Sequence, residues 1–369
     1  MKFTVSTSGL TKQLQLAAGA LTSNPVMPVL EDFLFELKGN TLNIASSNLE
    51  VSIRTSIEVS GSKNGKIAVP GKTILDVLKS LPEQPLTFEI NLETRGIELL
   101  SASGKYKLVG ENSADFPEIE TPSEADDKIE ISSEFLKKGI DKSSFAASND
   151  EMRQNMRGIN LNIDFNQITF ATTDAQKLVR YRFLDITSNV ATSLLLTKKS
   201  MQLLSSILPK DGKVAIHFNK SKVFFIYDNI LFTTRLVDAK FPDYNAVIPV
   251  DNSNILTINR DEILSTLKRM TIFANKSTSQ IVMSLNEGSL TMNAQDFDFN
   301  NEATEQLSCS YEGESLNIGL SAKNLIEMLS VLDSESVQFQ FNSSNKPVLL
   351  VPTDQKKGED LLMLIVTNS

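Results

Sequence analysis

The sequence contains one cysteine and one histidine among its 369 residues. A single cysteine, Cys309, excludes an internal disulfide and a metal site built from several cysteines. The single histidine, His217, lies in the alternating run VAIHF, which is typical of a half-buried strand position rather than a catalytic one. Many side chains that enzymes use are therefore missing, and we expect no catalytic residue, no metal and no cofactor.

Long apolar runs and a phosphate-binding loop are also missing. No stretch approaches the ~18 to 20 apolar residues that span a bilayer, and the start MKFTVSTSGL has no apolar signal core. The nearest run to a phosphate loop, GSKNGKI at residues 61–67, is one residue short and has no Ser or Thr after its Lys. We therefore expect a cytoplasmic protein that makes no membrane contact.

One short pattern is written three times, at residues 69–81 (VPGKTILDVLKSL), 196–208 (LTKKSMQLLSSIL) and 320–332 (LSAKNLIEMLSVL). In each copy an alternating run is followed by a lysine (Lys72, Lys199, Lys323) and then by mostly apolar residues at i, i+3, i+4 and i+7. The switch from period two to period 3.6 predicts a strand, a helix cap and a one-faced helix. The copies lie 127 and 124 residues apart, which indicates an internal repeat.

A second repeated unit precedes each copy, and alternating runs with short polar turns fill the space between the two helices. An acidic run at 118–127 (EIETPSEADD) and a second run at 249–254 (PVDNSN) are the expected linkers. The sequence therefore predicts an α+β protein of three repeated domains, each with two helices packed on antiparallel sheets. Their predicted limits are 1–125, 126–251 and 252–369.

The formal charge of −9 is unevenly distributed. Six expected helix windows hold twelve Lys or Arg against six Asp or Glu, so the rest of the chain carries −15. Two interpretations remain open at this point. The charged residues are either ordinary solvated helix faces, or the six helices share one positive surface that attracts a phosphate backbone without reading base sequence.

Four stretches then give a family resemblance: DAKFPDYNAVIP (238–249), TTDAQKL (172–178), MRGINLNI (156–163) and ADFPEIE (114–120). With the threefold repeat, they resemble the bacterial DNA polymerase III beta subunits, the DNA sliding clamps, along the whole chain. The resemblance implies three DNA-clamp domains and a head-to-tail homodimer that forms a ring around duplex DNA. The ring would be a processivity factor for DNA replication, without enzymatic activity of its own. Its expected partners are DNA polymerase III alpha subunit, the clamp loader and other proteins with a clamp-binding motif.

The resemblance also implies three sets of site residues. A peptide-binding pocket is expected at Met156, Thr173, Ala175, Gln176, Lys177, Leu178, Pro242, Ala246, Val247, Pro347, Leu361, Leu362, Met363, Leu364 and Ile365. DNA contacts are expected at Asn24, Lys72, Lys79, Lys137, Arg153, Lys198 and Lys199. The dimer interface is expected to join Lys105, Tyr106, Lys107 and Leu108 to Ile272, Phe273, Glu302 and Glu305.

The chain departs from the family pattern at several of these positions. Ala175, Gln176 and Lys177 stand where Gly, His and Arg are frequent, the end at 363–366 (MLIV) differs from the usual Met-Pro-Met-Arg, and Asn24 replaces an arginine of some members. Deletion of residues 362–369 is expected to abolish peptide binding and to leave the dimer intact. Two other functions are weighed against the clamp: a peptide-binding adaptor without DNA, which the helix lysines argue against, and a hydrolase with dispersed carboxylates.

Overall fold

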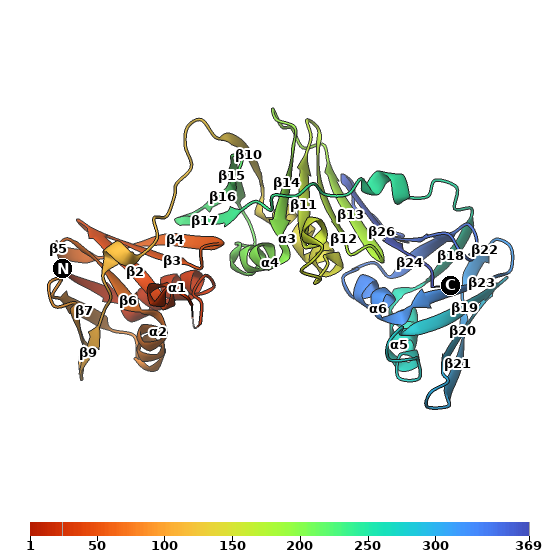
Figure 1. The fold of residues 1–369 in the computed structure, drawn as a ribbon, viewed down its shortest axis with the longest axis horizontal. Helices are drawn as coiled ribbons and strands as arrows, with labels where there is room; N and C mark the ends of the chain where they lie inside the picture. Colours follow the sequence, from red (N-terminus) through yellow and green to blue (C-terminus); the bar gives the residue numbers. More distant parts are fainter. Residues whose placement is uncertain (24, 369) are drawn as a thin grey trace. The chain divides into compact units, whose positions relative to one another are not determined.

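The fold is shown in Figure 1 as a computed structural model that describes residues 1–23 and 25–368. The chain divides into two compact units, Met1–Glu134 with Ser206–Leu236, and Phe135–Ser205 with Val237–Ser369. Each unit contains two antiparallel sheets. Among the described residues, no helix combines the length and the apolarity that a membrane span requires.

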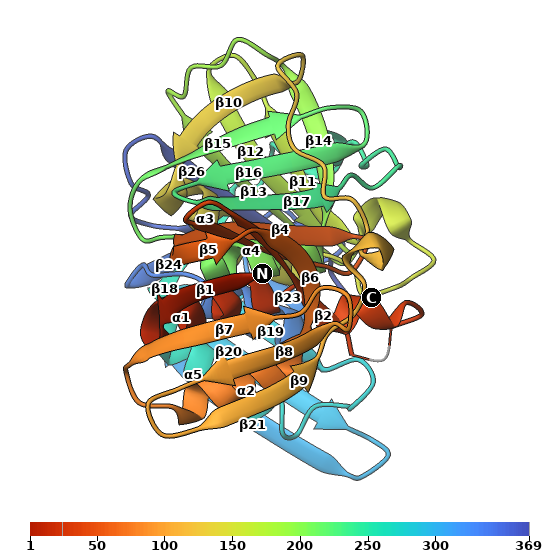
Figure 2. The same ribbon diagram turned by 90° about the vertical axis from the view of Figure 1, so that its left-hand side faces the viewer.

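The smaller sheet of the first unit has a free edge at its last strand, as Figure 2 shows. Its order is β5 (Ser60–Lys63), β1 (Lys2–Ser6), β7 (Pro85–Ile90), β8 (Gly96–Leu100) and β9 (Lys105–Val109). The larger sheet has the order β10 (Asp127–Ser132), β15 (Lys213–Phe218), β16 (Lys222–Tyr227), β17 (Ile230–Arg235), β4 (Val51–Glu58), β3 (Thr41–Ser47), β2 (Asp32–Lys38) and β6 (Gly65–Pro70). Strands of the second sequence repeat therefore join strands of the first through the pair β17 and β4.

The two helices of the first repeat, α1 (Thr7–Ala18) and α2 (Gly71–Ser80), contact each other. Ser6 begins α1 because its side chain accepts a hydrogen bond from the Gly9 backbone amide. Beneath the helices lies an aromatic core in which the rings of Phe3 and Phe88 stack at 4.8 Å. The short helices η1 (Pro28–Glu31) and η2 (Ser113–Asp115) complete the repeat.

The larger sheet of the second unit joins strands of the second and third repeats. Its order is β14 (Thr192–Thr197), β11 (Gly158–Ile163), β12 (Gln167–Thr173), β13 (Lys177–Leu184), β26 (Glu359–Ile365), β25 (Val348–Pro352), β24 (Ser336–Phe341), β18 (Asn254–Asn259) and β22 (Ser310–Glu312). The smaller sheet has the order β21 (Asn301–Ser308), β20 (Ser289–Asp296), β19 (Gln280–Asn286) and β23 (Leu316–Ser321).

The central position of β26 changes one expectation from the sequence. Residues 362–369 were expected to be removable without loss of the dimer, but β26 pairs with both β13 and β25. Met363 and Ile365 are fully buried. Deletion would remove most of a central strand and expose the backbone groups of two neighbours, so we expect it to unfold this sheet.

The remaining helices follow the predicted repeat. They are α3 (Ser133–Ser143), η3 (Ser144–Ala146), η4 (Gln154–Met156), α4 (Lys198–Ile207), η5 (Tyr244–Val247), α5 (Arg260–Met270) and α6 (Ala322–Ser330). The three stretches predicted as helices from the repeated pattern are α2, α4 and α6, which confirms that interpretation. The antiparallel sheets and the helices likewise confirm the α+β class.

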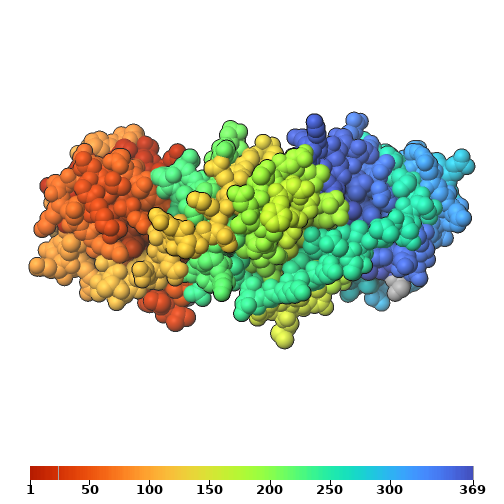
Figure 3. Space-filling view, turned by 90° about the horizontal axis from the view of Figure 1, so that it is seen from above, coloured from red at the N-terminus to blue at the C-terminus, as the bar shows by residue number. Residues whose placement is uncertain are grey.

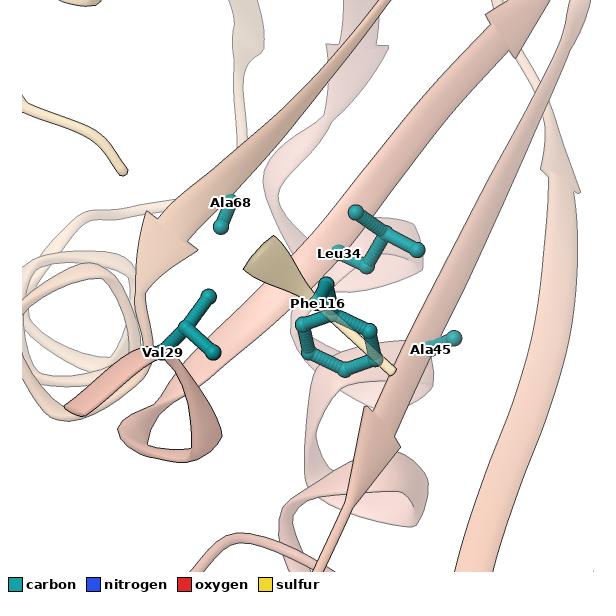
Figure 4. Packing of buried hydrophobic residues seen from close by; sticks show 5 residues of the cluster. All are labelled: Val29, Leu34, Ala45, Ala68 and Phe116. Atoms are coloured by element: carbon teal, nitrogen blue, oxygen red, sulfur yellow. The ribbon is translucent and has the colours of Figure 1, made fainter. Parts of the chain in front are cut away.

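Each of the two connecting segments is anchored by a phenylalanine. Phe116 packs against Val29, Leu34, Ala45 and Ala68, as Figure 4 shows. In the second unit, Phe241 packs in the same way against Ala171 and Leu195, and the segment that follows it runs over the surface in Figure 3. These contacts fix the course of chain segments that have little regular structure of their own.

Candidate functional site

An apolar cluster lies on the sheet of the second unit, where β13 meets β26. Its buried members are Leu178, Leu349, Leu362 and Leu364, and the half-buried Tyr244, Ile248 and Val351 pack against them. The strand register places Leu178 directly opposite Leu364. Three of the residues predicted for the pocket, Leu178, Leu362 and Leu364, therefore come together.

The other three residues predicted in β26 lie on the opposite face of the strand. Leu361, Met363 and Ile365 alternate with Leu362 and Leu364 and are at most 4% exposed. Successive side chains of a strand point to opposite faces, so one side cannot carry all five. These three residues support the sheet from behind the cluster.

The loop beside the cluster is held by its own side chains. Thr173 Oγ1 donates a hydrogen bond to the Lys177 carbonyl at 2.8 Å and accepts one from the Ala175 amide at 3.1 Å. Asp174 Oδ1 accepts from the amides of Gln176 and Lys177, both at 2.9 Å. Ala175 has φ +76°, in the left-handed region that glycine adopts without strain, so the turn is kept although the residue is alanine.

Lys177 lies under this loop rather than on its surface. It is 7% exposed, and its Nζ lies 2.7 Å from Asp174 Oδ2 and 3.1 Å from Glu327 Oε2. It also donates to Asn324 Oδ1 at 3.2 Å. Lys177 therefore ties the loop to α6, and it positions the loop rather than offering a charge to a ligand.

A cavity of about 650 Å³ opens beside the loop. Gln176 and Lys177 line it together with Asn324, Thr278 and Gln280. Its lining is polar, in contrast to the leucine cluster. The two surfaces together could hold an extended segment with apolar and polar side chains.

The other residues predicted for the pocket lie at the surface of the second unit. Met156, Pro242 and Pro347 are half-buried, and the Pro347 carbonyl accepts a hydrogen bond from Asn252 Nδ2 at 3.3 Å. Ala246 and Val247 are exposed, with Val247 at 54%. None of these five is among the residues of the leucine cluster.

The basic residues predicted to contact DNA differ in exposure and in whether they already bind other side chains or carbonyl groups. Lys72 and Lys79 are exposed on α2, and Lys199 is exposed on α4. Lys137 instead donates to the Ser205 carbonyl at 2.9 Å and lies 3.3 Å from Asp141.

Two further basic residues of this set also have partners. Arg153 pairs with Asp150 at 3.4 Å. Burial lowers the pKa of Lys198, and Glu327 acts in the opposite direction. The last predicted contact, Asn24, lies outside the described residues.

The first half of the predicted dimer interface is the edge strand β9. Its residues alternate, with Lys105 and Lys107 exposed and Tyr106 and Leu108 half-buried. Both lysines pair with Glu98, at 2.6 and 3.3 Å.

The second half lies near β21, the edge strand of the smaller sheet of the second unit. Ile272 and Phe273 are 64% and 39% exposed. Glu302 is exposed, but Glu305 accepts two hydrogen bonds from Arg269, at 2.6 and 2.9 Å. These bonds are the main reason that the pKa of Glu305 is lowered.

Comparisons with known proteins agree along the whole chain. Sequence models of the DNA polymerase III beta subunit match its N-terminal domain at residues 1–120, its central domain at 130–243 and its C-terminal domain at 245–365. The chain belongs to the family of DNA polymerase III beta subunits. The resemblance seen in the sequence is thus confirmed, and with it the three clamp domains.

Individual relatives are similar over their full length. The beta sliding clamp of Pseudomonas aeruginosa is 27% identical, over 98% of this chain and 99% of its own. That of Synechococcus elongatus is also 27% identical, over the whole of both chains. The crystal structure of the Pseudomonas aeruginosa beta subunit has a TM-score of 0.94 and 25% identity over the whole of both chains. A second structure from that organism, with griselimycin bound, has a TM-score of 0.93.

Membership of the beta subunit family also supports the expectation of a non-catalytic replication protein. The described residues contain no group of His, Cys, Asp and Glu suited to a metal ion.

The sequence reasoning missed several residues at these surfaces. Leu349 and Val351 complete the cluster, and the apolar run VLLVP at 348–352 was a usable signal for them. Phe297 and Phe299, in the turn before β21, are 83% and 70% exposed. Two aromatic side chains in an exposed turn beside an edge strand were a signal for an interface.

Proposed function

We propose that this beta subunit acts as a DNA sliding clamp: a closed homodimer that encircles duplex DNA and tethers the replicative polymerase to it. The observation that carries the proposal is the pairing of equivalent strands. The third strand after the second helix of one repeat pairs with the third strand after the first helix of the preceding repeat. These pairs are β17 with β4, and β26 with β13. By the same rule β9, the third strand after α2, would pair with β21, the third strand after α5. Within one chain these two strands do not pair, and each forms the edge of its sheet.

A second copy would satisfy both edges at once. If β9 of each chain pairs with β21 of the other, a head-to-tail dimer closes with two identical contacts. Tyr106, Leu108, Ile272 and Phe273 would supply apolar burial, with Phe297 nearby. Lys105, Lys107 and Glu302 would set the orientation at the rim.

The tether would use the leucine cluster and the polar cavity beside it. Leu178, Leu362 and Leu364, with Met156, Pro242 and Val247 nearby, would accept an apolar anchor of a partner's extended segment. Such segments would come from DNA polymerase III alpha subunit, from the clamp loader and from other proteins that carry a clamp-binding motif. A known beta subunit that binds the ligand griselimycin supports a ligand-binding surface in this fold.

DNA would be held by enclosure rather than by strong contacts. Lys72, Lys79, Lys137, Arg153, Lys198 and Lys199 would provide weak, sequence-independent attraction in a protein whose overall charge is −9. The domain limits would be 1–125, 126–251 and 252–369, and the site of action would be the cytoplasm.

Topological retention on DNA tests the proposal. We expect protein that a clamp loader has placed on nicked circular DNA to remain bound in high salt, and to be lost when the circle is made linear. Replacement of Lys72, Lys198 and Lys199 by Ala should reduce direct DNA affinity and its salt slope, roughly −0.9 per phosphate contact, and should leave retention on circles largely intact.

Equal loss from linear and circular DNA in high salt would exclude encirclement. The basic helices would then be only a binding patch. A failure of the purified chain to bind DNA by either route would favour the adaptor function considered above.

A further inference from the structure

The loop that borders the leucine cluster has a counterpart in the first repeat. Asn48 Oδ1 accepts hydrogen bonds from the amides of Glu50 and Val51 at 3.1 and 2.7 Å. The Leu49 amide donates to Ser47 Oγ at 3.2 Å, and Leu49 has φ +72°. This is the hydrogen-bonding pattern of the loop at residues 173–177, including the residue in the left-handed region.

The strand beside this first loop is attached in the same way. The Arg235 amide donates to the Glu50 carbonyl at 3.1 Å, as the Val366 amide does to the Gln176 carbonyl at 2.9 Å. The strand register places Thr233 opposite Ser52. In the second unit, Leu364 lies opposite Leu178 at the corresponding positions.

The connecting segment completes the correspondence. In both repeats a buried phenylalanine is followed by a proline, Pro117 in one and Pro242 in the other. Pro117 lines a cavity of about 80 Å³ together with the first loop and β17. The first unit therefore contains the loop, strand and linker that border the leucine cluster in the second.

The chemistry of this first-unit cavity is different. Ser52 and Thr233 occupy the positions that Leu178 and Leu364 occupy in the other site. The hydroxyl of Thr233 is buried and has no hydrogen-bond partner among the described residues, although the residue is only 5% exposed. Most buried hydroxyl groups are paired, so this one keeps an unused capacity for a hydrogen bond.

The charged side chains that line the cavity favour a cation. Glu50, Glu118 and Glu120 provide three carboxylates, against the two basic residues Lys222 and Arg235. Lys222 Nζ lies 2.5 Å from Glu120, so these two charges offset each other, and the lining as a whole has one carboxylate more than it has basic groups. Carboxylates and a hydroxyl oxygen all accept hydrogen bonds, which a guanidinium or ammonium group donates.

We propose that this cavity is a second peptide-binding site, which accepts the Lys or Arg side chain of an extended partner segment. The inference rests on the proposed function in one respect, because it takes the equivalent leucine site to be a peptide site. The same framework would then hold two segments of different chemistry, an apolar anchor at one site and a basic one at the other.

The test uses the full-length protein with labelled Leu, Val and Thr methyl groups and two short probes. Both probes are acetylated and amidated peptides of four residues, one with Arg and one with Leu at the second position and Ser elsewhere. We expect the Arg peptide to shift the methyl signals of Leu49, Val51 and Thr233 saturably. The Leu peptide should shift those of Leu178 and Leu364.

Variants then assign the contact. Thr233→Val keeps the shape of the side chain and removes no hydrogen bond of the folded protein, so it should fold normally and raise the Kd of the Arg peptide about fivefold or more. Glu118→Gln should weaken the same peptide and reduce the salt dependence of its binding. Glu93→Gln, an exposed carboxylate of the same unit that does not line the cavity, should change neither.

The two proposals fail separately in this experiment. Loss of the Leu peptide's effect alone would contradict the tether function. Absence of saturable shifts at Val51 and Leu49 with the Arg peptide, or an unchanged Kd in Thr233→Val, would overturn the second site. Stronger binding of the Leu peptide than of the Arg peptide at Val51 would overturn its assignment to a basic side chain.

Discussion

Lys177 Nζ lies 2.7 Å from Asp174 Oδ2, in a side chain of which only 8% is exposed. This ion pair closes the loop at residues 173–177 from beneath, and Oε2 of Glu327 on α6 lies 3.1 Å from the same ammonium nitrogen. The surface that the loop presents to a partner is therefore shaped by an ion pair beneath the loop.

Loss of this lysine should loosen the loop. In Lys177→Met, Asp174 and Glu327 lose their shared cation, so we expect the free energy of unfolding to fall by about 1 to 3 kcal/mol, because both acids are partly solvated. Peptide affinity should fall as well. Denaturant titration and fluorescence anisotropy with a labelled clamp-binding peptide measure the two effects. Lys323→Met, an exposed lysine that lines the same polar cavity, serves as the control and should change stability little.

Leu362 should contribute to peptide binding without being essential to the fold. It is 9% exposed at the surface of the leucine cluster, whereas Met363 is fully buried behind it. We expect Leu362→Ala to weaken an apolar peptide by ~1 to 3 kcal/mol because the anchor loses contact area. Met363→Ala should instead lower the unfolding temperature, because the cavity that it leaves in the core reduces the free energy of unfolding by ~2 to 5 kcal/mol. The reverse pattern would show that the binding surface lies on the other face of β26.

Phe273 should stabilise the dimer. Phe273 is 39% exposed next to Ile272, and burial in an interface would remove this apolar surface from water. Phe273→Ala is expected to weaken dimerisation by ~2 to 4 kcal/mol, as measured by sedimentation over a range of concentrations. Phe165→Ala removes an exposed phenylalanine in the turn between β11 and β12 and should have no effect. An unchanged dimer in the Phe273 variant would place the interface elsewhere.

Asp32 should make stability depend on pH. Burial, followed by repulsion from Glu111 and Glu31, raises its pKa to about 6, and its Oδ2 has no hydrogen-bond partner among the described residues. Because the folded state holds this proton more tightly than the unfolded state, the contribution of Asp32 to stability is fully present below about pH 4 and is lost as the pH rises through 6. The full effect is about 3 kcal/mol at most.

Asp32→Asn should remove this dependence. We expect the variant to melt at a higher temperature than the parent protein above pH 6, with the difference shrinking toward pH 4. Thermal unfolding followed by circular dichroism between pH 4 and 8 gives the comparison. Asp76→Asn, an exposed carboxylate on α2, should leave the pH profile unchanged. A constant difference at every pH would assign the effect to packing instead of ionisation.

The sequence by itself determined the repeat, the helices and the family. The helices α2, α4 and α6 could be predicted because an amphipathic helix is encoded by residues a few positions apart, and the same local pattern occurs three times. The leucines of β26 were likewise visible as a run of apolar residues. A run of six consecutive apolar residues, 361–366, however, does not state which of them faces a ligand and which faces the core.

Tertiary structure decided the rest, because these features depend on which distant strands become neighbours. The pairing of β13 with β26 separates Leu362 and Leu364 from Leu361, Met363 and Ile365, and brings Leu349 to the same cluster. The approach of α6 to the loop turns Lys177 from an apparent surface charge into a buried support. Such contacts join residues more than a hundred positions apart, and no local periodicity records them.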